Sequence, residues 1–308
     1  MIVSDRLSAS KAKRRLYAED PHFRAGYISF ANAVGMEAVA DFTWPLASVI
    51  LKPESLAGRT ALACCMFLFA HGFVPLAATA VHLSSLAVRE IWRYQINVAT
   101  EERLYAMDRI FASGPSVFLV LRRPQERESA EGASASSMLN EIKGPSEPSK
   151  RKPWHLRASI GAAPSRLLTH VHVAEEPADV IRDVGVLFDE PQRRGLLQSI
   201  PQGEMKQDEV IDVVNDAASA YPEHDLDPTA SVRRLRQFLK RAASQDSNEA
   251  LALASSWLDS AEQGVASDWH RFITTVDLLD IDFDVWDLIT VGSDVMTMDQ
   301  EYERRLLD

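Results

Sequence analysis

Cysteine is nearly missing from this chain, and its scarcity excludes a fold held together by disulfides or by cysteine-ligated zinc. The 308 residues contain two cysteines, adjacent at Cys64 and Cys65. Neighbouring cysteines provide neither a disulfide framework nor the spaced pairs of a zinc site. The first fifteen residues carry charges but no apolar core. We therefore expect no secretory signal and a cytoplasmic protein.

A glycine-rich phosphate loop is missing as well, and so is a general excess of positive charge. The net charge of −11 argues against nucleic acid as a partner. The charge is unevenly placed, because residues 201–308 hold 9 Lys/Arg and 23 Asp/Glu, a net of −14 that leaves +3 for the first 200 residues. A mildly basic body with an acidic appendix suits a body that binds anions.

One apolar run is long enough to raise the question of a membrane span. Residues 61–83 are almost entirely apolar, and a membrane helix needs about 20 such residues. However, His71, Gly72 and Pro75 interrupt the run. We interpret it as a buried helix, a tight turn and a buried strand, and expect no membrane partner.

Strands and helices alternate up to residue 188. Apolar runs predict strands at 47–51, 73–83, 116–122 and 167–172. Helical spacing predicts helices from about 21, and at 59–70, 86–95, 100–112 and 178–188. Polar composition predicts loops at 124–137 and 142–166. The basic run at 11–15 is expected to be a solvated face.

Beyond residue 189 the pattern becomes helical throughout. Amphipathic helices are predicted at 207–220, 229–243, 247–263, 267–280 and 297–307. We therefore expect three segments: a helical N-terminal extension at 1–44, an α/β domain at 45–190, and a helical acidic C-terminal domain at 191–308.

The stretch from Leu167 to Phe188 carries the chemistry that needs explaining. His170 and His172 alternate at the end of an apolar run, and Glu175 and Glu176 follow. A histidine there can be a phosphate-carrying nucleophile, a metal ligand or a core residue, and taken alone the core interpretation is favoured. Alternate strand residues face the same side, so the two histidines and the glutamates could also bind a metal.

Five segments in order resemble nucleoside diphosphate kinases, a family that passes phosphate through a histidine. They cover residues 46–188, a little under half of the chain. The segments are LASVILKPES, HGFVPLAATAVHLS, FASGPSVFLVL, IKGPSEPSKRKPWHLR and HVHVAEEPADVIRDVGVLF. The resemblance implies an α+β fold of the ferredoxin-like type, with an antiparallel sheet and flanking helices, for residues 45–190.

The resemblance also implies catalytic roles. The family spacing to the aromatic Phe188 makes His172 the nucleophile and leaves His170 a packing or supporting role. Lys52 matches the lysine that contacts the transferred phosphate, where an ammonium can stabilise developing charge. Asp183 takes the position of the carboxylate that orients the histidine.

Nucleotide-binding roles follow in the same way. Ser146 replaces a loop threonine that touches phosphate, and Arg157 matches the loop arginine that clamps it. Thr169 replaces an asparagine that touches ribose, and Tyr94 falls close to an active-site tyrosine. The resemblance implies Mg²⁺ bound through the nucleotide's phosphates, with no protein metal site. It also admits a homo-oligomer, whose interfaces the terminal segments could cover or replace.

Several positions depart from the family. The base-stacking phenylalanine aligns with Arg103 or Leu104. The second phosphate-binding arginine falls near Asn140, where Arg122, Arg123 or Lys143 could substitute. Val173, Ala174 and Glu175 replace the Gly-Ser-Asp that follows the histidine. Phosphate-handling residues are mostly kept, and nucleoside-handling ones mostly are not.

The predicted function is a nucleotide phosphotransferase that transfers a terminal phosphate from ATP or another nucleotide through a phosphohistidine at His172. Two alternatives stay open. One is a nucleotide-binding module without transfer activity, and the other is a related enzyme that acts on a non-standard nucleotide-like or phosphate-ester substrate.

Overall fold

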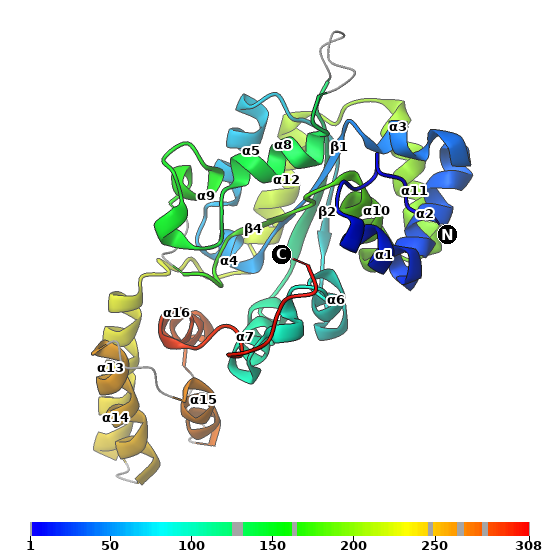
Figure 1. Cartoon of the computed structure of the whole chain (residues 1–308). Coiled ribbons are helices and arrows are strands. Elements are labelled where there is room, and N and C mark those ends of the chain that lie inside the picture. Colours follow the sequence, from blue (N-terminus) through cyan, green and yellow to red (C-terminus); the bar gives the residue numbers. More distant parts are fainter. Residues whose placement is uncertain are drawn as a thin grey trace.

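A four-stranded antiparallel sheet lies at the centre of the protein, with strand order β2-β3-β1-β4 (Figure 1). The computed structural model describes residues 2–124, 132–161, 165–245, 249–263, 268–278 and 283–307. This strand order confirms the predicted α+β fold of the ferredoxin-like type. The strands are β1 (Leu46–Leu51), β2 (Val74–Val81), β3 (Ser116–Arg122) and β4 (Val171–Val173).

Ten α-helices of the described chain surround the strands as far as residue 187. Three precede the sheet: α1 (Lys11–Glu19), α2 (Pro21–Val34) and α3 (Val39–Thr43). Two lie between β1 and β2: α4 (Pro53–Ala57) and α5 (Ala61–Ala70). Between β2 and β3 are α6 (Ser85–Ile91) and α7 (Glu101–Ala112). Between β3 and β4 are α8 (Ala135–Lys143) and α9 (Leu156–Ser159), and α10 (Pro177–Leu187) follows β4.

The two central strands are buried along almost their whole length. Every residue of β1 is buried, and in β3 only the last is partly exposed. This explains why both strands appear in the sequence as continuous apolar runs rather than as alternating patterns. The register places Ile50 opposite both Phe118 and His172, so these three side chains share one face of the sheet.

The N-terminal helices pack directly on α10. A Cβ atom added at Gly26 of α2 would lie 2.2 Å from the Ile181 carbonyl oxygen, and one at Gly185 of α10 would lie 2.1 Å from the His22 carbonyl oxygen. In α1, Lys13 is 5% exposed and donates to Asp179 Oδ2 of α10 at 2.8 Å. The expectation that residues 11–15 form a solvated face is therefore wrong at Lys13.

The C-terminal region is helical, as predicted, up to residue 295. Its helices α13 to α16 lie together at the lower left of Figure 1, and α12 packs against β2 and β3. None of the helices in the described ranges is long and apolar enough to cross a membrane. The elements are α11 (Glu190–Ser199), α12 (Gln207–Ala218), α13 (Pro228–Gln245), α14 (Glu249–Glu262), α15 (Trp269–Leu278) and α16 (Val285–Val295).

The helix predicted at 297–307 is wrong. This segment, here called the C-terminal tail, runs beside residues 94–100 as irregular chain. Asp299 forms an antiparallel bridge with Ala99, and the Leu307 amide donates to the Tyr94 carbonyl oxygen at 3.0 Å. The backbone groups of the tail thus find partners in a distant loop instead of within a helix, and Met298 and Leu307 are buried there.

Candidate functional site

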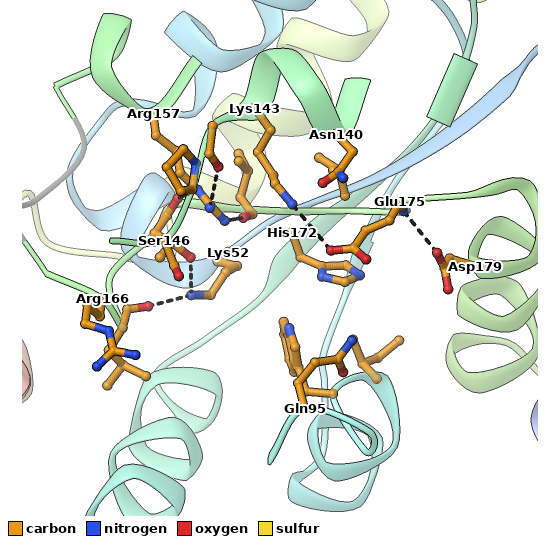
Figure 2. A pocket seen from close by; sticks show the side chains of 18 of the residues that line it. Lys52, Gln95, Asn140, Lys143, Ser146, Arg157, Arg166, His172, Glu175 and Asp179 are labelled. Carbon is orange, nitrogen blue, oxygen red and sulfur yellow. Dashed lines mark hydrogen bonds and ion pairs between the residues drawn. The ribbon is translucent and has the colours of Figure 1, made fainter. Parts of the chain in front are cut away.

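A cavity of about 460 Å³ lies beside β4, between the α6–α7 hairpin and α8 (Figure 2). Its volume is typical of sites that bind small molecules. Of the residues singled out in the sequence, the cavity is lined by Lys52, Ser146, Arg157, Thr169, His172 and Asp183, whereas Tyr94 is not part of the lining. The fold therefore brings six side chains, chosen from segments far apart in sequence, to one place.

His172 lies in the middle of β4 and forms part of the cavity wall. Its side chain is 19% exposed, and the ring of Trp92 packs edge-on against it at 5.2 Å between centroids. Nε2 is buried and has no hydrogen-bond partner among the described residues. This nitrogen lies 3.6 Å from Asp183 Oδ2.

Asp183 is held behind the histidine by the sheet. Its carboxylate is almost fully buried on α10, and the Ser48 hydroxyl of β1 donates to Oδ2 at 2.7 Å. The same oxygen faces His172 Nε2, slightly beyond hydrogen-bond distance. Such contacts are often long without substrate and shorten when it binds. The arrangement can orient the imidazole with Nε2 toward Asp183.

Lys52 directly follows β1 at the cavity, but its ammonium points to protein oxygens. It pairs with Glu54 Oε1 at 2.6 Å and donates to the Leu167 carbonyl oxygen at 2.9 Å and to Thr169 Oγ1 at 3.3 Å. Burial lowers the pKa of Lys52, while Glu54 opposes this effect. Each of the three N–H groups of the Lys52 ammonium thus has an acceptor oxygen within the protein. A ligand oxygen would have to replace one of these three acceptors.

Arg157 holds the loops around the cavity together. Its guanidinium donates to three backbone carbonyl oxygens: Nε to Thr169 at 3.2 Å, Nη1 to Gly144 at 2.8 Å and Nη2 to Val171 at 2.9 Å. Burial, followed by nearby Arg151, lowers the pKa of Arg157 to about 10. The fork that the resemblance assigns to a phosphate is engaged with the protein backbone.

The other predicted binding residues divide into two groups. Ser146 and Thr169 line the cavity, although the Thr169 hydroxyl already contacts Lys52. Tyr94 instead is buried beside α2, where its hydroxyl donates to Asp20 Oδ2 at 2.8 Å. Burial and Asp20 together raise the pKa of Tyr94 to about 12. In this arrangement Tyr94 is a packing residue rather than a wall of the cavity.

Lys143 is a cavity cation that the sequence could identify only as one of three substitutes for a missing arginine. It ends α8, within a region whose polar composition suggested a loop, and lies 4.0 Å from Glu175 Oε1 (Figure 2). Burial, and then Arg157, lower the pKa of Lys143 to about 8. The spacing of Asn140 and Lys143, one helical turn apart, was the available signal, because both line the cavity. Of the other two substitutes, Arg122 pairs with Glu204 and Arg123 lies over the Phe73 ring.

The alternation of His170 and His172 in the sequence predicted that both side chains face the same side of the strand. This prediction is wrong. β4 begins one residue later, and His170 has a φ of +65° that turns its side chain away. The buried ring contacts the Thr60 hydroxyl at 2.6 Å through Nδ1. No group of three or more His, Cys, Asp or Glu in the described ranges could hold a metal ion. The proposed His-x-His metal pair is therefore not formed.

The burial of His170 predicts a pH-dependent stability. Burial lowers its pKa from 6.5 to about 4, so the folded protein favours the neutral ring. The resulting stability is complete above pH 6.5 and is lost as the pH falls through 4, in total about 3 kcal/mol. Urea unfolding at about pH 7 and about pH 4 measures the free energy of unfolding at each pH. On lowering the pH, this free energy should fall by about 3 kcal/mol less in His170→Gln than in the wild type. An equal loss in both proteins would contradict the assignment.

Comparisons with known proteins found similarity among solved structures alone. No protein-family model matches the sequence, and no curated protein matches it. Among solved structures, the chain is similar to the nucleoside diphosphate kinase of Aquifex aeolicus, with 17% identity and a TM-score of 0.39 over 48% of this chain and 96% of that chain. It is also similar to an NDP kinase from Pyrobaculum aerophilum, with 17% identity and a TM-score of 0.37 over 48% of this chain and 97% of that one. These likenesses are distant and concern the fold alone.

Proposed function

We propose that this protein is a nucleotide phosphotransferase that carries a terminal phosphate on His172. The observation that carries the proposal is the position of His172, whose ring lines a cavity of about 460 Å³ while its Nε2 faces the buried carboxylate of Asp183 at 3.6 Å. A histidine oriented by a carboxylate and open to a cationic cavity can act as a nucleophile.

The proposed reaction has two half-reactions. Asp183 accepts a hydrogen bond from the Nε2–H group of His172 and so holds the neutral ring in the tautomer whose Nδ1 lone pair attacks the terminal phosphorus of the nucleotide. An N–P bond forms, the P–O bond to the nucleoside diphosphate breaks, and the diphosphate leaves with the bond's electron pair. An anionic oxygen of the acceptor then attacks the phosphorus of the phosphohistidine, an O–P bond forms, the N–P bond breaks, and its electron pair returns to Nδ1 and restores the free ring. Because one site serves both steps in turn, the kinetics are ping-pong.

Charge stabilisation in this proposal comes from the cations of the cavity. Lys143 pairs with Glu175 only at 4.0 Å, so its ammonium can approach a phosphoryl oxygen with little rearrangement. Below about pH 8 it is charged, which favours transfer at neutral pH. Lys52 and Arg157 contribute in this proposal mainly by holding Thr169 and the loop at Gly144 in place.

Magnesium would enter with the nucleotide. Mg²⁺ in such sites is bound largely by substrate phosphates and water, with few protein ligands. Two carboxylates on this cavity are engaged with cations, Asp179 with Lys13 and Glu175 with Lys143, and Asp183 is engaged with Ser48 and His172 in this proposal. The residues present therefore fit a metal carried by phosphates, which would neutralise charge on them, rather than one held by the protein.

Labelling tests the proposal directly. The full-length protein incubated with γ-³²P-labelled ATP or GTP and Mg²⁺ should acquire label that is stable to base and lost in acid, as expected for phosphohistidine. Peptide mapping should place the label on the peptide containing residues 171–173. Absence of label with every nucleoside triphosphate tested would refute transfer through histidine.

A second candidate is a nucleotide-binding module without transfer activity. The observation that favours it is the engagement of Lys52 and Arg157, whose donors are matched by protein oxygens. Saturable binding of a nucleotide by calorimetry, without label on the protein, would favour this candidate. If label forms but nucleoside diphosphates do not accept it, a screen of other phosphate acceptors would identify a related enzyme with a different substrate.

A further inference from the structure

Three arginines that line the cavity come from distant parts of the chain and meet at one carboxylate, that of Asp299. Arg103 comes from α7, Arg166 from the segment before β4, and Arg305 from the C-terminal tail. Arg103 pairs with Asp299 Oδ1, while Arg166 and Arg305 lie 3.4 Å and 2.8 Å from Asp299 Oδ2. All three arginines line the cavity that contains His172. We call these three residues the arginine cluster.

Positive charge is in excess at the arginine cluster. Its three cations face Asp299, and Arg166 Nε also lies 3.5 Å from Oε2 of Glu147. Arg103 Nε is buried and without a hydrogen-bond partner among the described residues. Burial lowers the pKa of Arg103, and the neighbouring Arg305 and Arg166 lower it further, while Asp299 opposes the shift. Two carboxylates against three guanidinium groups therefore leave an excess of positive charge at the cluster.

The tail segment that carries Asp299 also separates two cavities. A second cavity of about 390 Å³ is lined by Asp299 itself and shares Arg166 and Met298 with the first. The partition between them thus consists of side chains that belong to, or pair with, the tail. A movement of Asp299 away from the arginine cluster would leave its guanidinium groups, which already line the first cavity, without this carboxylate.

We propose that Arg103, Arg166 and Arg305 form a phosphate subsite that Asp299 occupies as an internal anion until a phosphorylated ligand displaces it. A carboxylate presents two oxygens to the guanidinium groups. A phosphate presents three and carries more charge, so it satisfies the cluster better. The subsite extends the cavity beyond His172 and takes the polyphosphate chain or a second phosphate of the ligand. When the ligand displaces Asp299, the tail moves together with the loop at Val98 and Ala99, to which its backbone is hydrogen-bonded.

This inference deepens the proposed function, since the subsite belongs to the same cavity, yet it can be tested without phosphoryl transfer. The probe is inorganic pyrophosphate, titrated by calorimetry into the full-length protein. If the form closed by Asp299 is about ten times more populated than the open one, Asp299→Asn should bind pyrophosphate about tenfold more tightly than the wild type. Arg305→Gln, in the otherwise wild-type chain, should weaken binding about fivefold or more.

Matched controls lie on the same tail. Glu303→Gln and Arg304→Gln make the same charge changes at exposed positions outside both cavities, and each should leave pyrophosphate affinity within about twofold of the wild type because exposed charges are screened by salt. Unchanged or weaker binding by Asp299→Asn with a native circular dichroism spectrum would overturn the proposal. Unchanged pyrophosphate binding by Arg305→Gln would also overturn the proposal. This test can be made even if the Asp299 variant does not fold.

A third variant separates this inference from the proposed function. His172→Ala removes the proposed nucleophile but no member of the arginine cluster. Asp299→Asn should therefore tighten pyrophosphate binding to the same extent in the His172→Ala background. If Asp299→Asn tightens binding in this way but the wild type forms no phosphohistidine, phosphoryl transfer through His172 is refuted and the phosphate subsite is still supported. Loss of the effect in the His172→Ala background would overturn the subsite.

Discussion

Replacing His172 with alanine is expected to reduce phosphoryl transfer on the order of 10⁶-fold, the loss found when the nucleophile of a covalent mechanism is removed. The ring is the group that lines the cavity in front of Asp183, and alanine has no nitrogen to carry phosphate. The pairing of β4 with β1 is made by main-chain atoms, so the sheet should be retained. The rate of label incorporation from γ-³²P-labelled ATP measures the effect.

His82→Ala is the matched control for this substitution. His82 is exposed at the end of β2 and lies outside the cavity lining, so labelling should match that of the wild type. Label on the His172→Ala protein would assign the chemistry to another residue. If both variants lost label equally, the effect would reflect damage to the fold rather than removal of a nucleophile.

The largest loss of stability is expected from Arg182→Met, about 3–5 kcal/mol in the free energy of unfolding. Arg182 is 2% exposed, and its Nε donates to Asp20 Oδ2 at 2.8 Å. Its other nitrogens donate to the carbonyl oxygens of Ile91 at 3.3 Å and Glu90 at 2.7 Å. Methionine fills much of the space but leaves the buried Asp20 carboxylate without its cation. Urea unfolding monitored by tryptophan fluorescence measures the difference.

Two further variants test the cause of this loss. Arg24→Met removes an exposed arginine from α2, and its effect should stay within about 0.5 kcal/mol. The double variant Asp20→Asn with Arg182→Met should be more stable than Arg182→Met alone, because no uncompensated charge remains buried. A loss below about 1 kcal/mol for Arg182→Met would show that the pair contributes little to the fold.

The strands could be predicted from the sequence because burial on both sides produces uninterrupted apolar runs. Residues 47–51 and 116–122 were such runs, and β1 and β3 follow them closely. The fourth strand was predicted at 167–172, but only residues 171–173 pair with β1. The reason is His170, whose positive φ breaks the extended chain. No sequence pattern marks a histidine for this conformation.

Most of the chosen residues that line the cavity could also be predicted from the sequence, but the directions in which their side chains point could not. Lys52 and Arg157 are at the cavity, as the family resemblance implied. Whether a guanidinium meets a ligand or the carbonyl oxygens of Gly144 and Val171 depends on loop conformations that composition does not define. Hydrophobic periodicity likewise predicted a helix for 297–307, since Met298 and Leu307 are buried in either arrangement.

The contact between α2 and α10 gives the protein a mechanical link to its cavity. At Gly26 and Gly185 the two helices approach with no side chain between their backbones, so there is no soft layer to absorb a relative displacement. Asp183 lies on α10 between Ile181 and Gly185, within the stretch that α2 contacts. Any force applied to α2, whether from a bound molecule or from a change of packing, would therefore be transmitted to the carboxylate behind His172.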